Sequence, residues 1–185
     1  MIKRRQEIIQ HPVSKIIYCY KYHQELFHEL KASEPDMVFT NRLEEVDDLL
    51  EPGTLVILDD LITDIKEGSK AHEIITRFFV STSHHMNSSF WLLCQNPYHK
   101  GLRTISLNSQ YCCIFATPRD KTIVNTMSRQ IAPGQSDDVV QSFIRATTKK
   151  LHGHLLMNLD GRSTDSRYWL RSSVLPEDDV EIYVP

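Results

Sequence analysis

Two adjacent carboxylates follow an apolar run in the segment TLVILDD (residues 54–60). Four aliphatic residues in succession, without alternation, are typical of a strand that is buried on both faces of a parallel sheet. Ligands of open α/β sheets bind just beyond the carboxyl ends of the strands. Two acids at such an end suit a hydrated Mg²⁺ ion that carries phosphates. In this interpretation Asp59 is the metal residue, and Asp60 is the acid that orients an attacking water.

A second polar strand end is predicted in FWLLCQN (90–96), where a buried strand runs into Gln95 and Asn96. A glutamine at the tip of a neighbouring strand can sense a γ-phosphate or position the nucleophilic water. Both segments also have simpler interpretations. Aspartate commonly begins turns and caps helices, and Gln95 can cap the turn before Pro97. The pair of polar tips favours a nucleotide site more strongly than either tip does alone.

Strands and helices alternate along the chain, which is the pattern of an α/β domain. Apolar and β-branched runs predict strands at 15–20, 37–40, 54–60, 88–96, 111–117, 152–160 and 168–171. Helical spacing of apolar residues predicts helices at 21–31, 42–50, 64–81, 119–131 and 136–150, after a helix tail within 1–11. This alternation predicts a three-layer α/β fold with a mostly parallel sheet. We expect one domain over 1–176 and an acidic, mobile tail over 177–185.

Composition narrows the function classes. A chain of 185 residues with 41% hydrophobic and 24% charged residues can bury a core and is not a disordered tail. The net charge of −3 gives no global basic field for nucleic acid, so a DNA partner needs a local basic surface. The four cysteines lack a C-x-x-C pair and mostly lie in apolar runs, which predicts reduced thiols in an intracellular protein. No apolar run approaches the ~20 residues that span a bilayer.

Taken in order, the segments IIYCY, LVILDDL, SHH, QNPYHKGLRTISLNSQY, TPRDK and RQIAPG resemble a known family. They are similar to the viral genome-packaging ATPases of the FtsK–HerA superfamily, above all to the poxvirus-like type carried by Polinton/Maverick elements and adintoviruses. The resemblance covers about residues 8 to 176. The segment QNPYHKGLRTISLNSQY followed by PRDK is highly specific, whereas LVILDD alone is not.

This resemblance implies a RecA-like P-loop NTPase core that hydrolyses ATP with Mg²⁺ and drives double-stranded DNA into a capsid. It implies a homo-oligomeric ring, capsid or portal proteins as partners, no membrane, and a place in the host nucleus, a viral factory or the virion. LVILDD becomes the Walker B strand and Gln95 the sensor. An arginine that reaches into a neighbouring subunit's site is also implied. The candidates are Arg119, which we favour because it follows a strand tip, then Arg103, and Arg129.

One family element is missing from the sequence. A Walker A loop requires G-x-x-x-x-G-K-[ST], whose amides and lysine hold the phosphates. None of the glycines at 53, 68, 101, 134, 153 and 161 lies in that pattern. In the family the first strand, the loop and its helix directly precede the IIYCY strand. We therefore expect an N-terminally truncated form that lacks the first strand, the P-loop and most of its helix, and that does not hydrolyse ATP.

Other interpretations stay open. The missing loop also fits a degenerate, non-catalytic remnant or interaction module of an integrated viral element. A helicase or transposition ATPase of the same superfamily would have the same apolar strands with polar ends, but it accounts less well for the segment NPYHKGLRTISLNS. Two further histidine arrangements have weak metal potential: the adjacent pair His84 and His85, and the pair His152 and His154, which would share one strand face without a third ligand.

Overall fold

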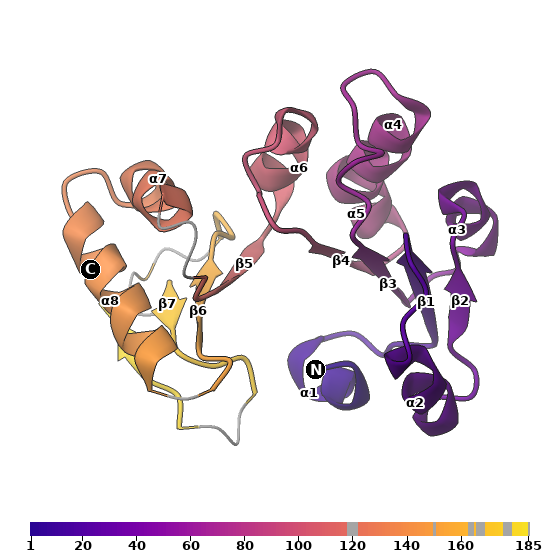
Figure 1. Cartoon of the computed structure of the whole chain (residues 1–185), viewed down its shortest axis with the longest axis horizontal. Coiled ribbons are helices and arrows are strands. Elements are labelled where there is room, and N and C mark those ends of the chain that lie inside the picture. The colour runs from indigo at the N-terminus through magenta and orange to yellow at the C-terminus, as the bar shows by residue number, and fades with distance from the viewer. Residues whose placement is uncertain (118–121, 150, 163–164, 166–168, 176–178, 185) are drawn as a thin grey trace. The chain divides into compact units, whose positions relative to one another are not determined.

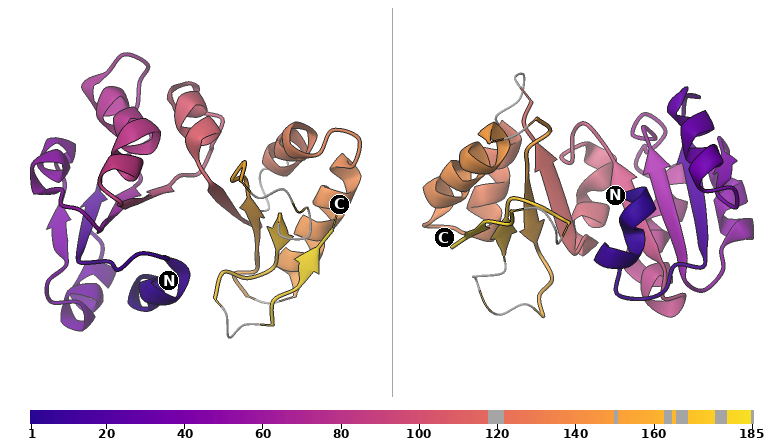
Figure 2. Two further views of the ribbon diagram at one scale, coloured as in Figure 1. Left: turned by 180° about the vertical axis from the view of Figure 1, so that it is seen from behind. Right: turned by 90° about the horizontal axis from the view of Figure 1, so that it is seen from below.

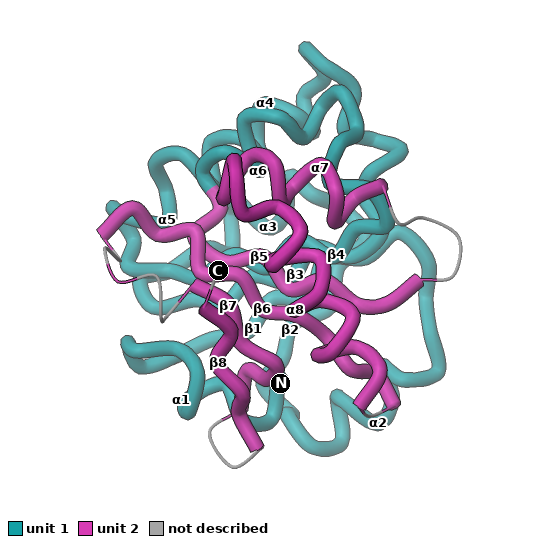
Figure 3. Tube along the Cα trace, turned by 90° about the vertical axis from the view of Figure 1, so that its left-hand side faces the viewer, with its two compact units in different colours: residues 1–108 teal, residues 109–185 magenta. Residues whose placement is uncertain are grey.

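The computed structural model describes residues 1–117, 122–149, 151–162, 165, 169–175 and 179–184. The chain forms two compact units, unit 1 over Met1–Asn108 and unit 2 over Ser109–Pro185, which are coloured separately in Figure 3. Each unit has its own four-stranded sheet and its own hydrophobic core. Of the described helices, none combines the length and the apolar character that a membrane crossing requires.

Unit 1 is built on a parallel sheet with the strand order β2-β1-β3-β4. The strands are β1 (Lys15–Tyr20), β2 (Val38–Thr40), β3 (Thr54–Asp59) and β4 (Ser89–Leu93). Every described residue of β3 from Thr54 to Leu58 is buried. The unbroken aliphatic run therefore forms a central strand, as the sequence pattern predicts. Because all four strands run the same way, their carboxyl ends lie along one edge of the sheet.

Helices cover both faces of this sheet (Figures 1 and 2). One face is covered by α3 (Leu43–Leu49), α4 (Lys70–Arg77), the π-helical segment η2 (Phe78–Thr82), α5 (Ser83–His85), the 3-10 turn η3 (Lys100–Leu102) and α6 (Arg103–Asn108). The other is covered by the short turn η1 (Ile2–Arg4), α1 (Arg5–Ile8) and α2 (Leu26–Ser33). This arrangement is the three-layer α/β fold expected of a RecA-like P-loop NTPase core.

Alternation along the strands decides which side chains meet. In β1, Ile17 and Cys19 pack toward α3 and α4, whereas Ile16 and Tyr18 pack toward α2. Successive side chains of a strand point to opposite faces. The same rule in β3 places Ile57, and therefore Asp59 two residues later, on the α2 side of the sheet. Tyr18 and Asp59 thus share one face although 41 residues separate them in the chain.

Several elements of unit 1 differ from the sequence expectation. The helix predicted over 64–81 begins later, at Lys70, because the Ser69 hydroxyl caps it by accepting a hydrogen bond from the His72 amide at 3.2 Å. The segment 100–108, for which no element was expected, contains η3 and α6. Its glycine, serine and β-branched residues have weak helical preference, and buried Leu102 and Ile105 hold it against the core.

Unit 2 contains an antiparallel sheet with the strand order β5-β6-β7-β8. The strands are β5 (Tyr111–Phe115), β6 (His154–Asn158), β7 (Leu170–Arg171) and β8 (Ile182–Tyr183). The helices α7 (Thr122–Ile131) and α8 (Ser136–Thr148) bury Val124, Val139 and Ala146 in a common core with Leu155 and Met157. The two helices and the strands β5, β6 and β7 fall where the apolar patterns predict them.

The pairing in unit 2 differs from the parallel arrangement expected for its strands. β5 and β6 run antiparallel, with Cys113 opposite Leu156. The chain segment expected to be an acidic tail contributes β8, in which Tyr183 is buried and lies opposite Leu170. Apolar runs predict where strands occur, but they do not state the direction in which two strands pair.

Candidate functional site

The two polar strand ends lie side by side at the carboxyl edge of the unit 1 sheet. Asp59 is the last residue of β3 and is paired in register with Leu93, the last residue of β4. Gln95 follows Leu93 by two residues and is exposed. Asp59 and Gln95 therefore follow neighbouring parallel strands at the same edge, as a shared ligand site requires.

The Asp59 carboxylate is held by two neutral donors. The Tyr18 hydroxyl donates to Asp59 Oδ2 at 2.9 Å, and Gln24 Nε2 donates to the same oxygen at 3.2 Å. Tyr18 is only 5% exposed and stacks in an aromatic cluster with Phe27 and Phe39. Burial, and then the hydrogen bond to Asp59 and its charge, raise the pKa of the Tyr18 phenol above its usual value. The hydroxyl therefore stays protonated and remains a donor.

Asp60 adopts a left-handed backbone conformation, with φ at 54°. Aspartate tolerates this region better than most residues because its short polar side chain can bond locally. The left-handed residue ends β3 and turns the chain away from the sheet. The second carboxylate thus lies on the turn directly after the strand and is half-buried.

A lysine lies at the same edge but is engaged elsewhere. Lys21 follows β1, and its backbone amide donates to the Asp59 carbonyl at 3.2 Å. Its ammonium group lies 2.7 and 2.6 Å from the two carboxylate oxygens of Asp64. The hydrogen bond to Asp64 raises the pKa of Lys21, and the charge of Asp60 adds to this effect. Within the described residues, no cation forms an ion pair with Asp59 or Asp60.

The loops after β3 and β4 are pressed together at Gly101. A Cβ at this position would lie 2.5 Å from the Ile65 carbonyl oxygen and 2.9 Å from Ile65 Cγ2. Only glycine fits without a shift of one loop. In the same loop, Asn96 Oδ1 accepts a hydrogen bond from the Tyr98 amide at 2.8 Å. Asn96, a predicted nucleotide contact, therefore uses its side-chain oxygen to form its own turn.

The candidate arginines come from different parts of the chain. Arg103 is the first residue of α6 in unit 1 and is exposed. Arg129 is exposed near the end of α7 in unit 2. Arg119, the favoured candidate, lies outside the described residues. The role of an arginine that acts in a neighbouring subunit therefore stays a prediction.

The acidic edge fits a hydrated metal ion better than a metal caged by protein ligands. No group of three or more His, Cys, Asp or Glu side chains suited to a metal occurs in the part of the chain that the structure describes. His152 and His154 are not part of such a group. The Nδ1 atom of His154 instead contacts the carbonyl oxygen of His152 at 3.2 Å. Mg²⁺ usually keeps several waters and binds proteins through one or two carboxylates plus phosphates. Asp59 and Asp60 supply that donor set.

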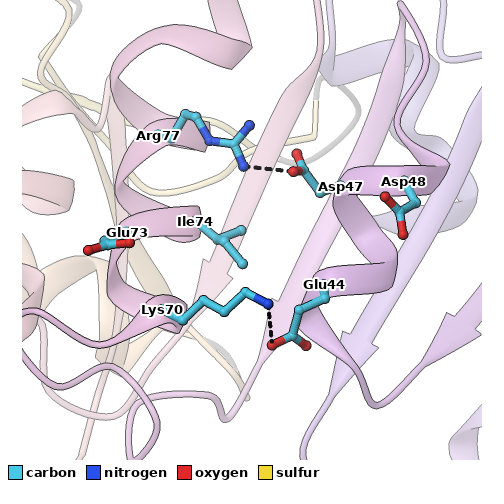
Figure 4. A pocket seen from close by; sticks show the side chains of 7 residues that line it. All are labelled: Glu44, Asp47, Asp48, Lys70, Glu73, Ile74 and Arg77. Carbon is cyan, nitrogen blue, oxygen red and sulfur yellow. Dashed lines mark hydrogen bonds and ion pairs between the residues drawn. The ribbon is translucent and has the colours of Figure 1, made fainter.

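A hollow of about 520 Å³ lies between α3 and α4 (Figure 4). Its charges are matched in two ion pairs, Arg77–Asp47 at 2.8 Å and Lys70–Glu44 at 3.7 Å. These side chains are largely exposed, so each pair contributes about 0–1 kcal/mol. The hollow is thus lined by surface ion pairs between two helices.

Sequence reasoning missed the residues that support Asp59. Tyr18 was assigned to a buried strand on its apolar pattern alone, and Gln24 to a helix that begins later, at Leu26. One signal was available for Tyr18. A buried phenol needs a hydrogen-bond partner, and an acid at the end of the adjacent strand can supply it. Lys21 and Gly101 gave no signal because their partners lie in other loops.

Comparisons with known proteins show likeness in fold only. No protein-family model and no curated protein matches the chain. Among solved structures, the genome packaging NTPase B204 from Sulfolobus turreted icosahedral virus 2, in complex with ATP-gammaS, is similar with a TM-score of 0.50 and 14% identity. That match covers 100% of this chain and 87% of B204. The B204 structure in complex with sulfate matches with the same score and identity, over 99% of this chain and 91% of that one.

Proposed function

We propose that this chain is a subunit of a viral genome-packaging motor of the NTPase class. In this proposal the carboxyl edge of the unit 1 sheet forms the acidic side of the nucleotide site. One observation carries the proposal: Asp59 and Gln95 follow adjacent parallel strands that are paired in register. Asp59 would hold the water shell of a Mg²⁺–nucleotide complex, Asp60 would orient the attacking water, and Gln95 would contact the γ-phosphate.

The fold likeness to B204 supports the motor class, because that protein is a packaging NTPase and was solved with ATP-gammaS. A ring of identical subunits acting on double-stranded DNA, in contact with capsid or portal proteins inside an infected cell, belongs to the same proposal. The finer assignment, to the Polinton and adintovirus type within the FtsK–HerA superfamily, rests on QNPYHKGLRTISLNSQY and PRDK in the sequence.

A second candidate function is a non-catalytic remnant or interaction module. It is favoured by one observation, namely that no G-x-x-x-x-G-K-[ST] loop occurs within these 185 residues. Phosphate binding would then rest on the acidic edge alone, so we expect weak nucleotide affinity and no turnover from this chain by itself. Hydrolysis of ATP that disappears in Asp60→Asn would contradict this expectation. A phosphate loop encoded in frame upstream of Met1 would favour the motor.

The proposal is tested by titrating the isotopically labelled chain with Mg²⁺–ATP-gammaS and following backbone amide resonances. We expect dissociation constants on the order of 1 mM, which corresponds to about −4 kcal/mol. The shifted amides should lie after β1, β3 and β4, around Lys21, Asp60 and Gln95. Because Asp59→Asn removes the charge and keeps an acceptor for Tyr18, it should abolish the shifts without unfolding the chain.

The matched control is Asp36→Asn, which changes an exposed acid just before β2, at the opposite edge of the parallel sheet. It should leave the nucleotide-induced shifts unchanged. Shifts that are absent at 10 mM nucleotide, or that map to another surface, would exclude the nucleotide site and favour the non-catalytic module. Equal loss of shifts in Asp59→Asn and Asp36→Asn would indicate general electrostatics rather than a site.

A further inference from the structure

We infer that Tyr18 and Gln24 are positioning residues that fix the orientation of the Asp59 carboxylate, so that one of its oxygens faces the metal–nucleotide complex. The inference rests on the proposed function and adds to it two residues that no motif marks. Its basis is the geometry at a single atom. Asp59 Oδ2 accepts hydrogen bonds from Tyr18 at 2.9 Å and from Gln24 at 3.2 Å, while no donor in the described residues reaches Oδ1.

Tyr18 is itself rigid, which makes it an effective anchor. It belongs to the middle of β1, where its Cα is paired with that of Ile57 in β3. Its ring lies 5.0 Å from the ring of Phe27 and 5.8 Å from that of Phe39, measured between centroids. A donor held by packing and by a strand leaves the carboxylate it binds little freedom to rotate.

The two donors orient the carboxylate without neutralising it. A phenol and an amide carry no net charge, so Asp59 keeps the negative charge that attracts a hydrated cation. The ammonium group of Lys21, which follows β1 at the same edge, is engaged by both oxygens of Asp64. Within the described residues, Asp59 therefore has no ion-pair partner, and its charge stays available to a hydrated cation.

The arrangement also explains why the two donors come from different parts of unit 1. Tyr18 lies within β1, while Gln24 lies in the loop that leads to α2 and is exposed. The buried donor fixes the carboxylate from beneath the edge, and the exposed donor closes it from the solvent side. Loss of Tyr18 should therefore disturb the orientation of Asp59 more than loss of Gln24.

The test uses Mn²⁺ alone as a paramagnetic probe of the full chain. In the wild type, Mn²⁺ should broaden the amide resonances of Asp59 and Asp60 at lower concentration than those elsewhere in the described chain. Tyr18→Phe should raise the concentration for half-broadening about tenfold, since loss of a group that orients a metal ligand typically costs 10–100-fold in affinity. Gln24→Ala should raise it by a smaller factor.

The control is Tyr22→Phe, which removes a hydroxyl from the same loop at a residue that is 68% exposed. It should leave the Mn²⁺ response unchanged. The hydrogen bond has its own signature: a slowly exchanging, low-field hydroxyl proton of Tyr18 that disappears in Asp59→Ala. Gln24→Ala keeps the test decisive if Tyr18→Phe disturbs folding, because the Gln24 side chain is exposed.

The outcomes separate the two proposals. Wild-type broadening at Asp59 with an unchanged response in Tyr18→Phe and Gln24→Ala would overturn the positioning role and leave the proposed function standing. A wild type that shows no selective broadening at Asp59 would overturn the metal site of the proposed function, and the positioning role with it. Broadening that weakens equally in Tyr22→Phe would assign the effect to the loop rather than to the two donors.

Discussion

Both units of this protein contain strands covered by helices, but of the described sheets only that of unit 1 has all its carboxyl ends at one edge. In unit 1 the strands are parallel and helices cover both faces. In unit 2 the strands are antiparallel, and α7 and α8 share a core with one face of the sheet. In a parallel sheet every carboxyl end lies at the same edge, whereas in an antiparallel sheet neighbouring ends alternate.

The parallel pairing places Asp59 and the segment that leads to Gln95 at one edge of unit 1, where the Tyr18 hydroxyl donates to Asp59. Asp59 is the last residue of β3, Gln95 follows β4 by two residues, and Tyr18 lies within β1 and bonds to Asp59. In unit 2 the described strands also pair segments that are distant in the chain, such as β5 and β6, but the antiparallel pairing places neighbouring carboxyl ends at opposite edges. The following substitutions test this contrast, beginning with the largest expected effect.

Removal of a core ring should affect unit 1 most. Phe78 is fully buried, and its ring stacks on Phe90 with a centroid distance of 4.8 Å. Phe78→Ala should lower the free energy of unfolding by about 3–5 kcal/mol, measured by urea denaturation. Phe115→Ala in unit 2 removes the same side chain from a site that is 49% exposed, and should cost about 1 kcal/mol or less. Similar losses of unfolding free energy in the two variants would contradict the burial of Phe78 and the exposure of Phe115.

A methyl group at Gly101 should disturb the site itself. Gly101→Ala places a carbon 2.5 Å from the Ile65 carbonyl oxygen and should cost about 1–3 kcal/mol through a shift of one loop. Gly153→Ala in unit 2 meets the Ala146 carbonyl oxygen at 2.7 Å and should cost a similar amount. Only Gly101→Ala should move the Gln95 amide resonance. Gly161→Ala, with no atom within 4 Å, is the neutral control.

Both units contain non-glycine residues in the left-handed backbone region, but of these only Asp60, in unit 1, belongs to the proposed nucleotide site. Asp60 in unit 1 and His152 in unit 2 have φ values of 54° and 60°. Replacement of either by valine should cost about 1–2 kcal/mol, because a β-branched residue is disfavoured in the left-handed region. Asp60→Asn should leave stability nearly unchanged while weakening the nucleotide response. An Asp60→Val variant as stable as the wild type would show that the turn after β3 has another conformation.

The smallest expected effect is a dependence on alkaline pH. Burial raises the pKa of the Cys19 thiol from 9.0 to about 12, and that of Cys113 in unit 2 likewise to about 12. The folded chain therefore keeps a proton that the unfolded chain releases. This stabilisation is complete below pH 9 and is lost as the pH rises toward 12. Between pH 8 and 9.5 each thiol should lower the free energy of unfolding by about 0.8 kcal/mol.

Cys19→Ala and Cys113→Ala should each reduce this pH slope, measured by urea denaturation at a series of pH values. The two reductions should be alike, because burial is the main cause in both units. If the free energy of unfolding of each variant falls between pH 8 and 9.5 as much as that of the wild type, the raised pKa values are contradicted.

The central strands were predictable because their residues allow one main arrangement. KIIYCY and TLVILD combine β-branched and aliphatic residues without polar interruption, and they form β1 and β3 at 15–20 and 54–59. The helix over 100–108 was not predictable, since its stability comes from the burial of Leu102 and Ile105 rather than from helical preference. The pairing direction in unit 2 was not predictable either, because apolar patterns carry no information on it.

The candidate site was predictable only in part, and for a related reason. Asp59 and Gln95 are visible in the sequence because each ends an apolar run. Tyr18 gives only the indirect signal of a buried phenol, because the acid that it bonds to lies 41 residues away on another strand. Which lysine neutralises which acid is likewise decided by the packing of loops, as the pairing of Lys21 with Asp64 rather than with Asp59 shows.

The direct packing of Gly101 on Ile65 has a mechanical consequence. Because Gly101 has no side chain, its backbone lies directly against Ile65, and we expect a displacement of the segment after β3 to push on the segment after β4. A movement of the loop after Asp60 should therefore reach α6, which begins at Arg103, two residues after Gly101 in the sequence. The absence of a side chain at Gly101 thus brings the two loops into direct backbone contact.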